Sequence, residues 1–335
     1  MAQSFYNPFD KFDFAPDTCF LSGQKLTSTE EVIPVFPRWM MTQFDLEDKP
    51  FKLLDESLTS YKNLTVPCAT NVYNTAIEPL EKEIENAFLK GYQAVNELDK
   101  LHLFQWIGKI IYGILYNEIK IGIKQQLAIG EPFNFSQSLQ HKFGNLHLML
   151  QSLIHKVEFD GPSPWSIQVF EVNNAPETFT YRDEINTLVF SIKLKDFGII
   201  ACLQDNGTNS IYHREFLEKI DNSKLHPIQF EELCARFFYS AYLFNRLPEY
   251  TILPTPDALC IEPMPLRGIS NTPPFDLWQN KTYGQVLENF WKPWGFSLFE
   301  IIKNPEKPIS FILDENEHFI LPETIDLPLE SDTTG

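Results

Sequence analysis

Three histidines, His141, His147 and His155, stand within one segment of periodic apolar residues, at spacings of six and eight. Histidines that bind zinc from one helix usually stand four residues apart, so that both imidazoles reach the metal. Here Gln151 stands four residues after His147. We therefore interpret the three side chains as polar-edge or capping histidines and not as metal ligands.

Two further polar clusters could belong to a site. Residues 181–184 read Tyr-Arg-Asp-Glu directly before a predicted strand, which favours a salt-bridge network there, with an active-site cluster as the alternative. Asp205-Asn206-Gly207 is typical of a turn. The chain has no GxGxxG, GxxxxGK[ST] or GxSxG motif, so nucleotide binding and serine hydrolase chemistry have no support.

Cysteine usage favours a reduced, cytoplasmic protein. The five cysteines, at positions 19, 68, 202, 234 and 260, are odd in number and far apart, which does not suggest a disulfide framework. The first thirty residues lack the basic and apolar segments of a signal peptide. No apolar run approaches the roughly 18 residues that span a bilayer, so we expect no membrane insertion.

Two segments near the N-terminus form an ordered pattern: CFLSGQKLTSTEEVIPVFPRWM at 19–40 and NLTVPCATNVYN at 63–74. The pattern resembles the treble-clef form of the HNH endonuclease superfamily, in which C-x-x-C-G, [DE]-H-x-I-P, N-L-x-x-x-C and C-x-x-C-N follow one another. In that family four thiolates hold a structural zinc, and the histidine is a general base beside a divalent metal. The resemblance covers about residues 19–90.

The resemblance implies a degenerate zinc site. The four ligand positions of the family hold Cys19, Ser22, Cys68 and Asn71. In a second register, Ala69 and Val72 would take the last two places. At most two thiolates remain in either register, so we do not expect a structural zinc.

The catalytic positions of the family are altered as well. Glu31 stands where the family has its histidine, after the acidic Glu30, and Asn63 matches the asparagine of the middle motif. A carboxylate lacks the near-neutral pKa of an imidazole. The resemblance thus implies a non-catalytic module without a cofactor. The alternative is a metal-dependent nuclease that uses Glu30, Glu31 and Asn63 with Mg²⁺ or Mn²⁺.

The charge of the chain argues against nucleic-acid binding. The sequence has 27 Lys and Arg against 45 Asp and Glu, a net charge of −18, whereas nucleic-acid binders rely on cations that contact phosphates. Residues 1–68 alone carry six basic against ten acidic side chains. We therefore expect a protein partner and not a nucleic acid.

Hydrophobic periodicity and turn residues predict the elements. Helices are expected from about 77 to 99, at 101–128, from the N-cap Ser136 to about 153, and at 213–220, 228–245 and 283–291. Strands are expected at 165–172, 186–194, 197–204, 250–253, 258–262 and 309–313. The second and third strands form a hairpin through Lys195-Asp196.

The predicted fold class is α+β. Its parts are an irregular treble-clef-like module at residues 1–90, a helical segment at 91–160, an α+β body at 161–322 and a flexible acidic tail at 323–335. Beyond the N-terminal module, the chain resembles an uncharacterised family of Bacteroidetes-type proteins in phrases such as GNLHLMLQSL and PLRG, which implies no activity.

Aromatic residues gather in the segment 278–295, which holds Trp278, Tyr283, Trp291 and Trp294. Trp and Tyr are frequent at recognition surfaces, although three Trp near Pro and Gly also fix tertiary corners. This segment is a candidate interface.

The leading hypothesis is a cytoplasmic, non-catalytic interaction protein, such as an accessory subunit of a larger assembly. The nuclease described above is the alternative. A third hypothesis is an enzyme of unrecognised type in the α+β body, which a deep pocket lined by Arg182, Asp183, His213 or Arg214 would favour.

Overall fold

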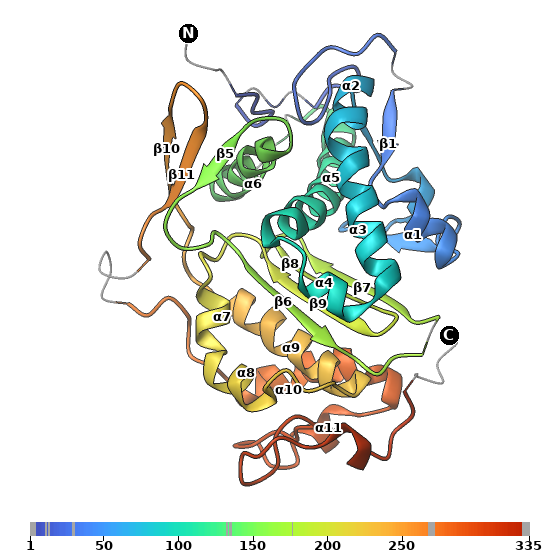
Figure 1. The fold of residues 1–335 in the computed structure, drawn as a ribbon, viewed down its shortest axis with the longest axis vertical. Coiled ribbons are helices and arrows are strands. Elements are labelled where there is room, and N and C mark those ends of the chain that lie inside the picture. Colours follow the sequence, from blue (N-terminus) through green and yellow to red (C-terminus); the bar gives the residue numbers. More distant parts are fainter. Residues whose placement is uncertain are drawn as a thin grey trace. The chain divides into compact units, whose positions relative to one another are not determined.

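The computed structural model describes residues 5–10, 12, 14–28, 31–131, 133, 136–175, 177–266 and 272–329. They form helices and several small sheets, so the fold class is α+β, as predicted (Figure 1). The chain divides into two compact units. Unit 1 comprises residues 1–89, 98–162 and 247–264, and unit 2 comprises residues 90–97, 163–246 and 265–335. The expected module and most of the helical segment thus belong to one unit.

Unit 1 is built around the long helix α5 (Lys100–Ala128), which begins at the N-cap Asp99. Every residue of 103–116 is buried, so this part of α5 is enclosed on all sides. It packs against α6 (Gln137–Leu150) and β4 (Thr65–Pro67). None of the described helices, α5 included, combines the length and apolarity that crossing a bilayer requires.

The other elements of unit 1 are shorter than α5. They are β1 (Val32–Pro34), α1 (Arg38–Gln43), β2 (Pro50–Lys52), β3 (Leu58–Ser60), the 3₁₀ turn η1 (Tyr61–Asn63), α2 (Thr70–Val72), the π-helical turn η2 (Tyr73–Ile77), α3 (Glu78–Lys90), η3 (Gln151–Leu153), β5 (Val157–Phe159), β10 (Tyr250–Pro254) and β11 (Leu259–Pro263). β1 pairs with β4 and β2 with β3, both antiparallel. β11 lies between β10, which is antiparallel to it, and β5, which is parallel.

Unit 2 contains a four-stranded antiparallel sheet in the order β6-β9-β8-β7. Its strands are β6 (Ser166–Glu171), β7 (Phe179–Glu184), β8 (Val189–Leu194) and β9 (Phe197–Cys202). Helix α9 (Pro227–Leu243) packs against β8 and β9, and α10 (Asn280–Trp291) packs on α9 (Figure 1). Gly198 permits this approach, because a Cβ there would lie 2.3 Å from the ring of Phe230.

Smaller helices complete unit 2. They are α4 (Tyr92–Asn96), α7 (Thr208–Tyr212), α8 (Arg214–Ile220), η4 (Lys292–Trp294), α11 (Leu298–Ile301) and η5 (Pro322–Thr324).

The structure differs from the predicted elements in several places. The helix expected from 77 to 99 is broken at Gly91, whose φ is +90° and whose Cβ position is occupied by the Asp196 carboxylate at 2.6 Å. Strand β7 was not predicted. No strand forms at 309–313, where Leu313 makes only an isolated bridge with Phe319. The N-cap Ser136, which accepts a hydrogen bond from Leu139 N, is confirmed, as is the hairpin of β8 and β9.

Candidate functional site

Cys19 and Cys68 lie together in the interior of unit 1. Both are buried, and the Cys68 thiol donates a hydrogen bond to Ala69 O at 3.6 Å. The two cysteine side chains also interact with each other, so that each shifts the pKa of the other. The side chain of Ser22 and the backbone of Ser22 and Ala69 also lie close to the Cys19 sulfur. Against the opposing effect of burial, these polar neighbours, Cys68 above all, lower the pKa of Cys19 to about 5, while Cys19 and burial together raise the pKa of Cys68. The side chains at three of the four predicted zinc positions, Cys19, Ser22 and Cys68, therefore lie close together.

A tight turn presents Cys19 and Ser22. Gly23 N donates to Cys19 O at 3.0 Å, and Cys19 N donates to Gln24 O at 2.8 Å. Gly23 has a φ of +70°, a conformation that glycine adopts without the steric penalty of a side chain. Phe20 N donates to Pro67 O at 2.8 Å and so joins this turn to β4, one residue before Cys68.

Two side chains at the C-terminal end of helix α6 form hydrogen bonds with this turn. His147 Nε2 lies 2.8 Å from Phe20 O, and Gln151 Nε2 donates to Leu21 O at 2.8 Å. The two side chains stand one helical turn apart, so they reach successive carbonyls. Burial lowers the pKa of His147 to about 4, which keeps the imidazole neutral. The interpretation of His147 as a polar-edge histidine was wrong, because the side chain is fully buried and its hydrogen-bond partner is a carbonyl of the turn.

Glu31, at the place of the family's catalytic histidine, is engaged in local hydrogen bonds. Its Oε1 accepts from Thr27 N at 3.1 Å, from Ser28 N at 3.3 Å and from the Thr27 hydroxyl. Its Oε2 accepts from Thr70 Oγ1 at 3.3 Å. These bonds, that of the Thr27 hydroxyl above all, lower the pKa of Glu31. The carboxylate thus joins the segment before β1 to the start of α2. Glu30 lies outside the described residues.

The other residues predicted for the catalytic or zinc site are either exposed to solvent or buried in the core. Asn63, in η1, and Asn71, in α2, are both exposed, and the Asn71 carbonyl accepts from Thr75 Oγ1 at 2.8 Å. In the second register, Ala69 and Val72 are buried apolar side chains.

This donor set does not fit a structural zinc, which takes four Cys or His ligands. Two thiols, a hydroxyl and an exposed amide stand at the four positions of the first register. Within the described part of the chain, no three His, Cys, Asp or Glu side chains are grouped as ligands of a metal ion would be.

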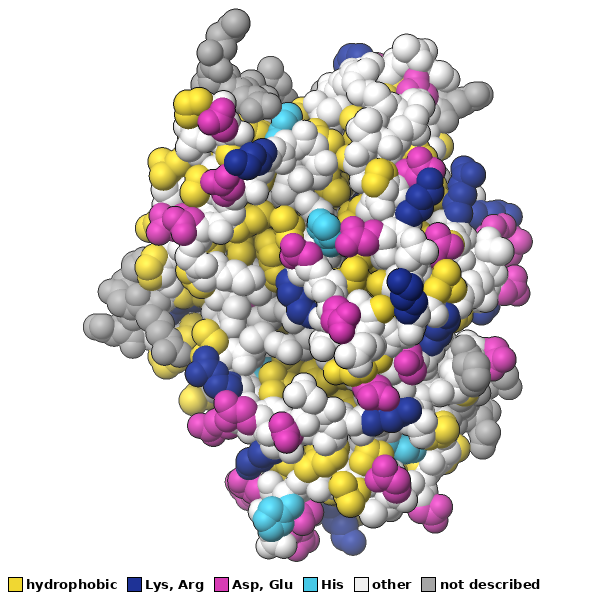
Figure 2. Space-filling model, viewed as in Figure 1, with side chains coloured by type: hydrophobic (Ala, Val, Ile, Leu, Met, Phe, Trp, Pro, Cys, Tyr) yellow, Lys and Arg dark blue, Asp and Glu magenta, His cyan; other side chains and the backbone are white. Residues whose placement is uncertain are grey.

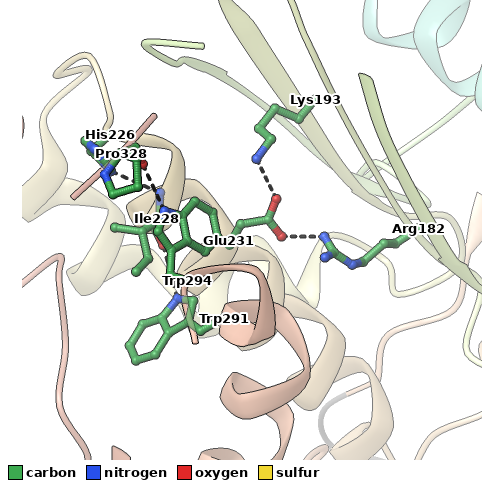
Figure 3. Close-up of polar contacts among 8 residues, drawn as sticks. All are labelled: Arg182, Lys193, His226, Ile228, Glu231, Trp291, Trp294 and Pro328. Carbon is green, nitrogen blue, oxygen red and sulfur yellow. Dashed lines mark hydrogen bonds and ion pairs between the residues drawn. The ribbon is translucent and has the colours of Figure 1, made fainter. Parts of the chain in front are cut away.

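The aromatic segment of unit 2 divides into core and cavity residues. Trp291 is fully buried and its Nε1 donates to Ile228 O at 3.3 Å, while Trp294 Nε1 donates to Pro328 O at 2.9 Å (Figure 3). Trp278 and Tyr283 line a cavity of about 490 Å³ together with His213. The four residues therefore do not form one interface surface.

Arg182 belongs to a charged cluster that connects the sheet to α9. Arg182 on β7 and Lys193 on β8 each donate to a different oxygen of Glu231 on α9 (Figure 3). The predicted salt-bridge network is confirmed for Arg182, although it runs across the fold and not along the strand. Lys193 and Glu231 were not predicted as members of this cluster, although each is a charged residue inside an otherwise apolar strand or helix. Arg182 and Lys193 line a second cavity, of about 250 Å³.

Charges on the surface are mixed. On the face drawn in Figure 2, Lys and Arg side chains stand singly or in small groups among Asp and Glu, with no extended basic patch among the described residues. Comparisons with protein families, with curated proteins and with solved structures find no match to this chain.

Proposed function

We propose that this protein is a cytoplasmic, non-catalytic interaction protein, acting as an accessory subunit of a larger assembly. Its N-terminal module would be an HNH-like scaffold that has exchanged its zinc for hydrogen bonds and apolar packing. The proximity of the Cys19 and Cys68 side chains carries this proposal, because it brings together two ligand positions of the resemblance without a full set of ligands. The free, scattered cysteines support the reduced compartment.

Apolar packing and buried hydrogen bonds stabilise the fold of the module in place of a bound metal. Phe20, from the turn, stacks on Tyr112 of α5 with ring centroids 5.9 Å apart. Lys109 of α5 donates to Pro34 O and Val35 O at the end of β1. The module therefore contacts α5 through apolar and polar groups, and its fold does not depend on four thiolates.

An exposed apolar surface on unit 1 supports a role in protein recognition. The tip of the β2–β3 hairpin is fixed to α5, because Leu54 N donates to Glu118 Oε1 at 2.8 Å and Gln125 Nε2 donates to Asp55 Oδ2 at 2.7 Å. These two elements expose large apolar side chains, listed here with their exposed fractions: Leu54 (58%), Leu58 (69%), Leu127 (68%) and Ile129 (70%). Carboxylates beside such apolar groups suit a partner that carries apolar residues flanked by Lys or Arg.

The experiment compares binding and metal chemistry in one preparation of the full chain. We expect less than about one tenth of an equivalent of zinc, no nicking of plasmid with Mg²⁺ or Mn²⁺, and a partner that co-purifies with the native chain. The double substitution Leu58→Asp/Leu127→Asp should abolish recovery of that partner. Leu253→Asp, at an exposed position of β10, is the matched control and should retain it. Stoichiometric zinc, or nicking that Glu31→Ala abolishes, would instead establish the nuclease.

A further inference from the structure

The cluster around Glu231 contains more positive than negative charge. Glu231 is 2% exposed, and its Oε1 lies 2.7 Å from Nζ of Lys193, a side chain that is 7% exposed. Its Oε2 pairs with Arg182, whose side chain is 28% exposed. Two cations therefore converge on one buried carboxylate, in a chain whose overall charge is −18.

The surroundings compensate this excess charge only in part. The Lys193 ammonium lies 5.7 Å from the Trp294 ring centroid, and the Arg182 guanidinium lies 4.7 Å from that of Phe290. Aromatic faces attract cations but carry no net charge. Glu177 is the other acidic side chain among the described residues that line the cavity, and it is exposed to solvent, which screens it. A buried cation that lacks a counter-charge is unfavourable.

The cavity beside the two cations can hold the missing counter-charge. Its volume is about 250 Å³, and the residues that line it include Thr180 besides the charged cluster. Arg182 uses one of its five N–H donors for Glu231 in the described contacts, which leaves donors for a second acceptor. A guanidinium binds the oxygens of phosphates and carboxylates in pairs, and an ammonium adds a point charge.

We propose that this cavity binds a small oxyanion, a phosphate or carboxylate group, between Arg182 and Lys193. Glu231 then limits the affinity of the site: its carboxylate pairs with both cations, takes up part of their charge and so competes with the anion. The anion is a free ion or a group on a larger molecule, and both present the same oxygens to the cluster. The site lies wholly within unit 2 and does not depend on the function proposed for the N-terminal module.

Calorimetric titration of the full chain with inorganic phosphate, at ionic strength held constant with KCl, tests the site. We expect saturable binding by the native chain and at least tenfold weaker binding after Arg182→Gln. Arg214→Gln, on the exposed surface of α8, should leave the affinity unchanged. Glu231→Gln has the opposite expected sign: it removes the competing carboxylate and should strengthen phosphate binding about tenfold.

A cluster that serves only to stabilise the fold would behave differently. It would lower the thermal stability of the Glu231→Gln variant without making that stability depend on phosphate. Titration with phenyl phosphate then distinguishes the sources of the anion, since tighter binding than that of inorganic phosphate assigns the group to a larger molecule, and weaker binding assigns it to the free ion. If the native chain binds neither, or if Arg182→Gln binds phosphate as the native chain does, the proposal is wrong.

Discussion

The side chains of Cys19 and Cys68 lie next to each other in the interior of unit 1, where each shifts the pKa of the other. The two residues reach this contact from different elements: Cys19 from a tight turn and Cys68 from the end of β4. Ser22 lies beside them, within hydrogen-bond reach of the Cys19 sulfur. The turn and the segment that joins β4 to α2 thus bring these side chains to one point in the fold.

Restoring two thiols should restore metal binding. In the double variant Ser22→Cys/Asn71→Cys, four thiolates would stand at the positions given by the resemblance, and we expect about one tightly bound zinc per chain and a higher melting temperature with zinc than with a chelator. The measurement is metal content after dialysis, paired with calorimetry.

The other register supplies the control for this graft. Ser22→Cys/Val72→Cys places its second new thiol at a buried apolar position, so we expect it to bind less zinc than the first variant. Failure of both variants to retain zinc would contradict the degenerate zinc site.

Substitution of Gly23 should destabilise unit 1 through two separate effects. Its φ is +70° and an added Cβ would lie 2.4 Å from the ring of Tyr6. Left-handed backbone costs a residue with a side chain about 1–2 kcal/mol, and overpacking adds about 1–3 kcal/mol. We therefore expect Gly23→Ala to lower the free energy of unfolding in urea by roughly 2–5 kcal/mol.

Gly130 separates the two effects. Its φ is +78°, but no atom lies within 4 Å of an added Cβ. Gly130→Ala should thus show the backbone effect alone, about 1–2 kcal/mol. Equal losses in the two variants would show that contact with Tyr6 is unimportant.

Local signals made part of the fold predictable. Helix α6 starts at Ser136 because a hydroxyl at that place accepts from Leu139 N, and this depends on four neighbouring residues only. The β8–β9 hairpin likewise follows from two strand-like runs beside a two-residue connection. The contact of Gly91 and Tyr92 with the carboxylate of Asp196 at the helix break could not be predicted, because Asp196 is distant in the sequence.

The candidate sites depended on contacts between distant residues. The resemblance assigned Cys19 and Cys68 to ligand positions of one degenerate zinc site, and their side chains lie close together. It gave no indication that Glu31 would be held by Thr27 and Thr70. The Lys193–Glu231 pair could not be predicted either. The strand and helix patterns indicate that each charge is buried, but they do not indicate which residue it pairs with.

The stability of unit 1 should fall with acid because of His147. Burial lowers the pKa of its folded-state imidazole from 6.5 to about 4. Between these values the unfolded chain binds a proton that the folded chain does not, so stability decreases as the pH falls through this range and changes no further below it. The effect of this one group is about 3 kcal/mol.

The variant His147→Gln isolates this contribution. It has no titrating group at that position, so the free energy of unfolding should vary less between pH 7 and pH 4 than in the native chain. The comparison is urea denaturation at several pH values, with His102→Gln at a partly exposed site of α5 as the control. Identical pH profiles for the native chain and His147→Gln would exclude His147 as the cause.

Lys109 should be among the residues of α5 most sensitive to substitution. It is 2% exposed, and its Nζ donates to Pro34 O at 3.0 Å, Val35 O at 2.9 Å and Glu81 Oε1 at 2.7 Å. Lys109→Met removes all three bonds and leaves the Glu81 carboxylate without its cation, for which we expect a loss of about 3–5 kcal/mol in the free energy of unfolding.

A double-mutant cycle shows whether the unpaired carboxylate causes this loss. Adding Glu81→Leu to Lys109→Met removes the remaining charge, and the double variant should be more stable than Lys109→Met alone. The exposed pair Lys82–Glu78 on α3 is the matched control, and Lys82→Met should cause no measurable change because solvent screens that pair. If Lys109→Met unfolds at the same urea concentration as Lys82→Met, the buried lysine does not join β1 and α3 to α5 in the way that its three hydrogen bonds indicate.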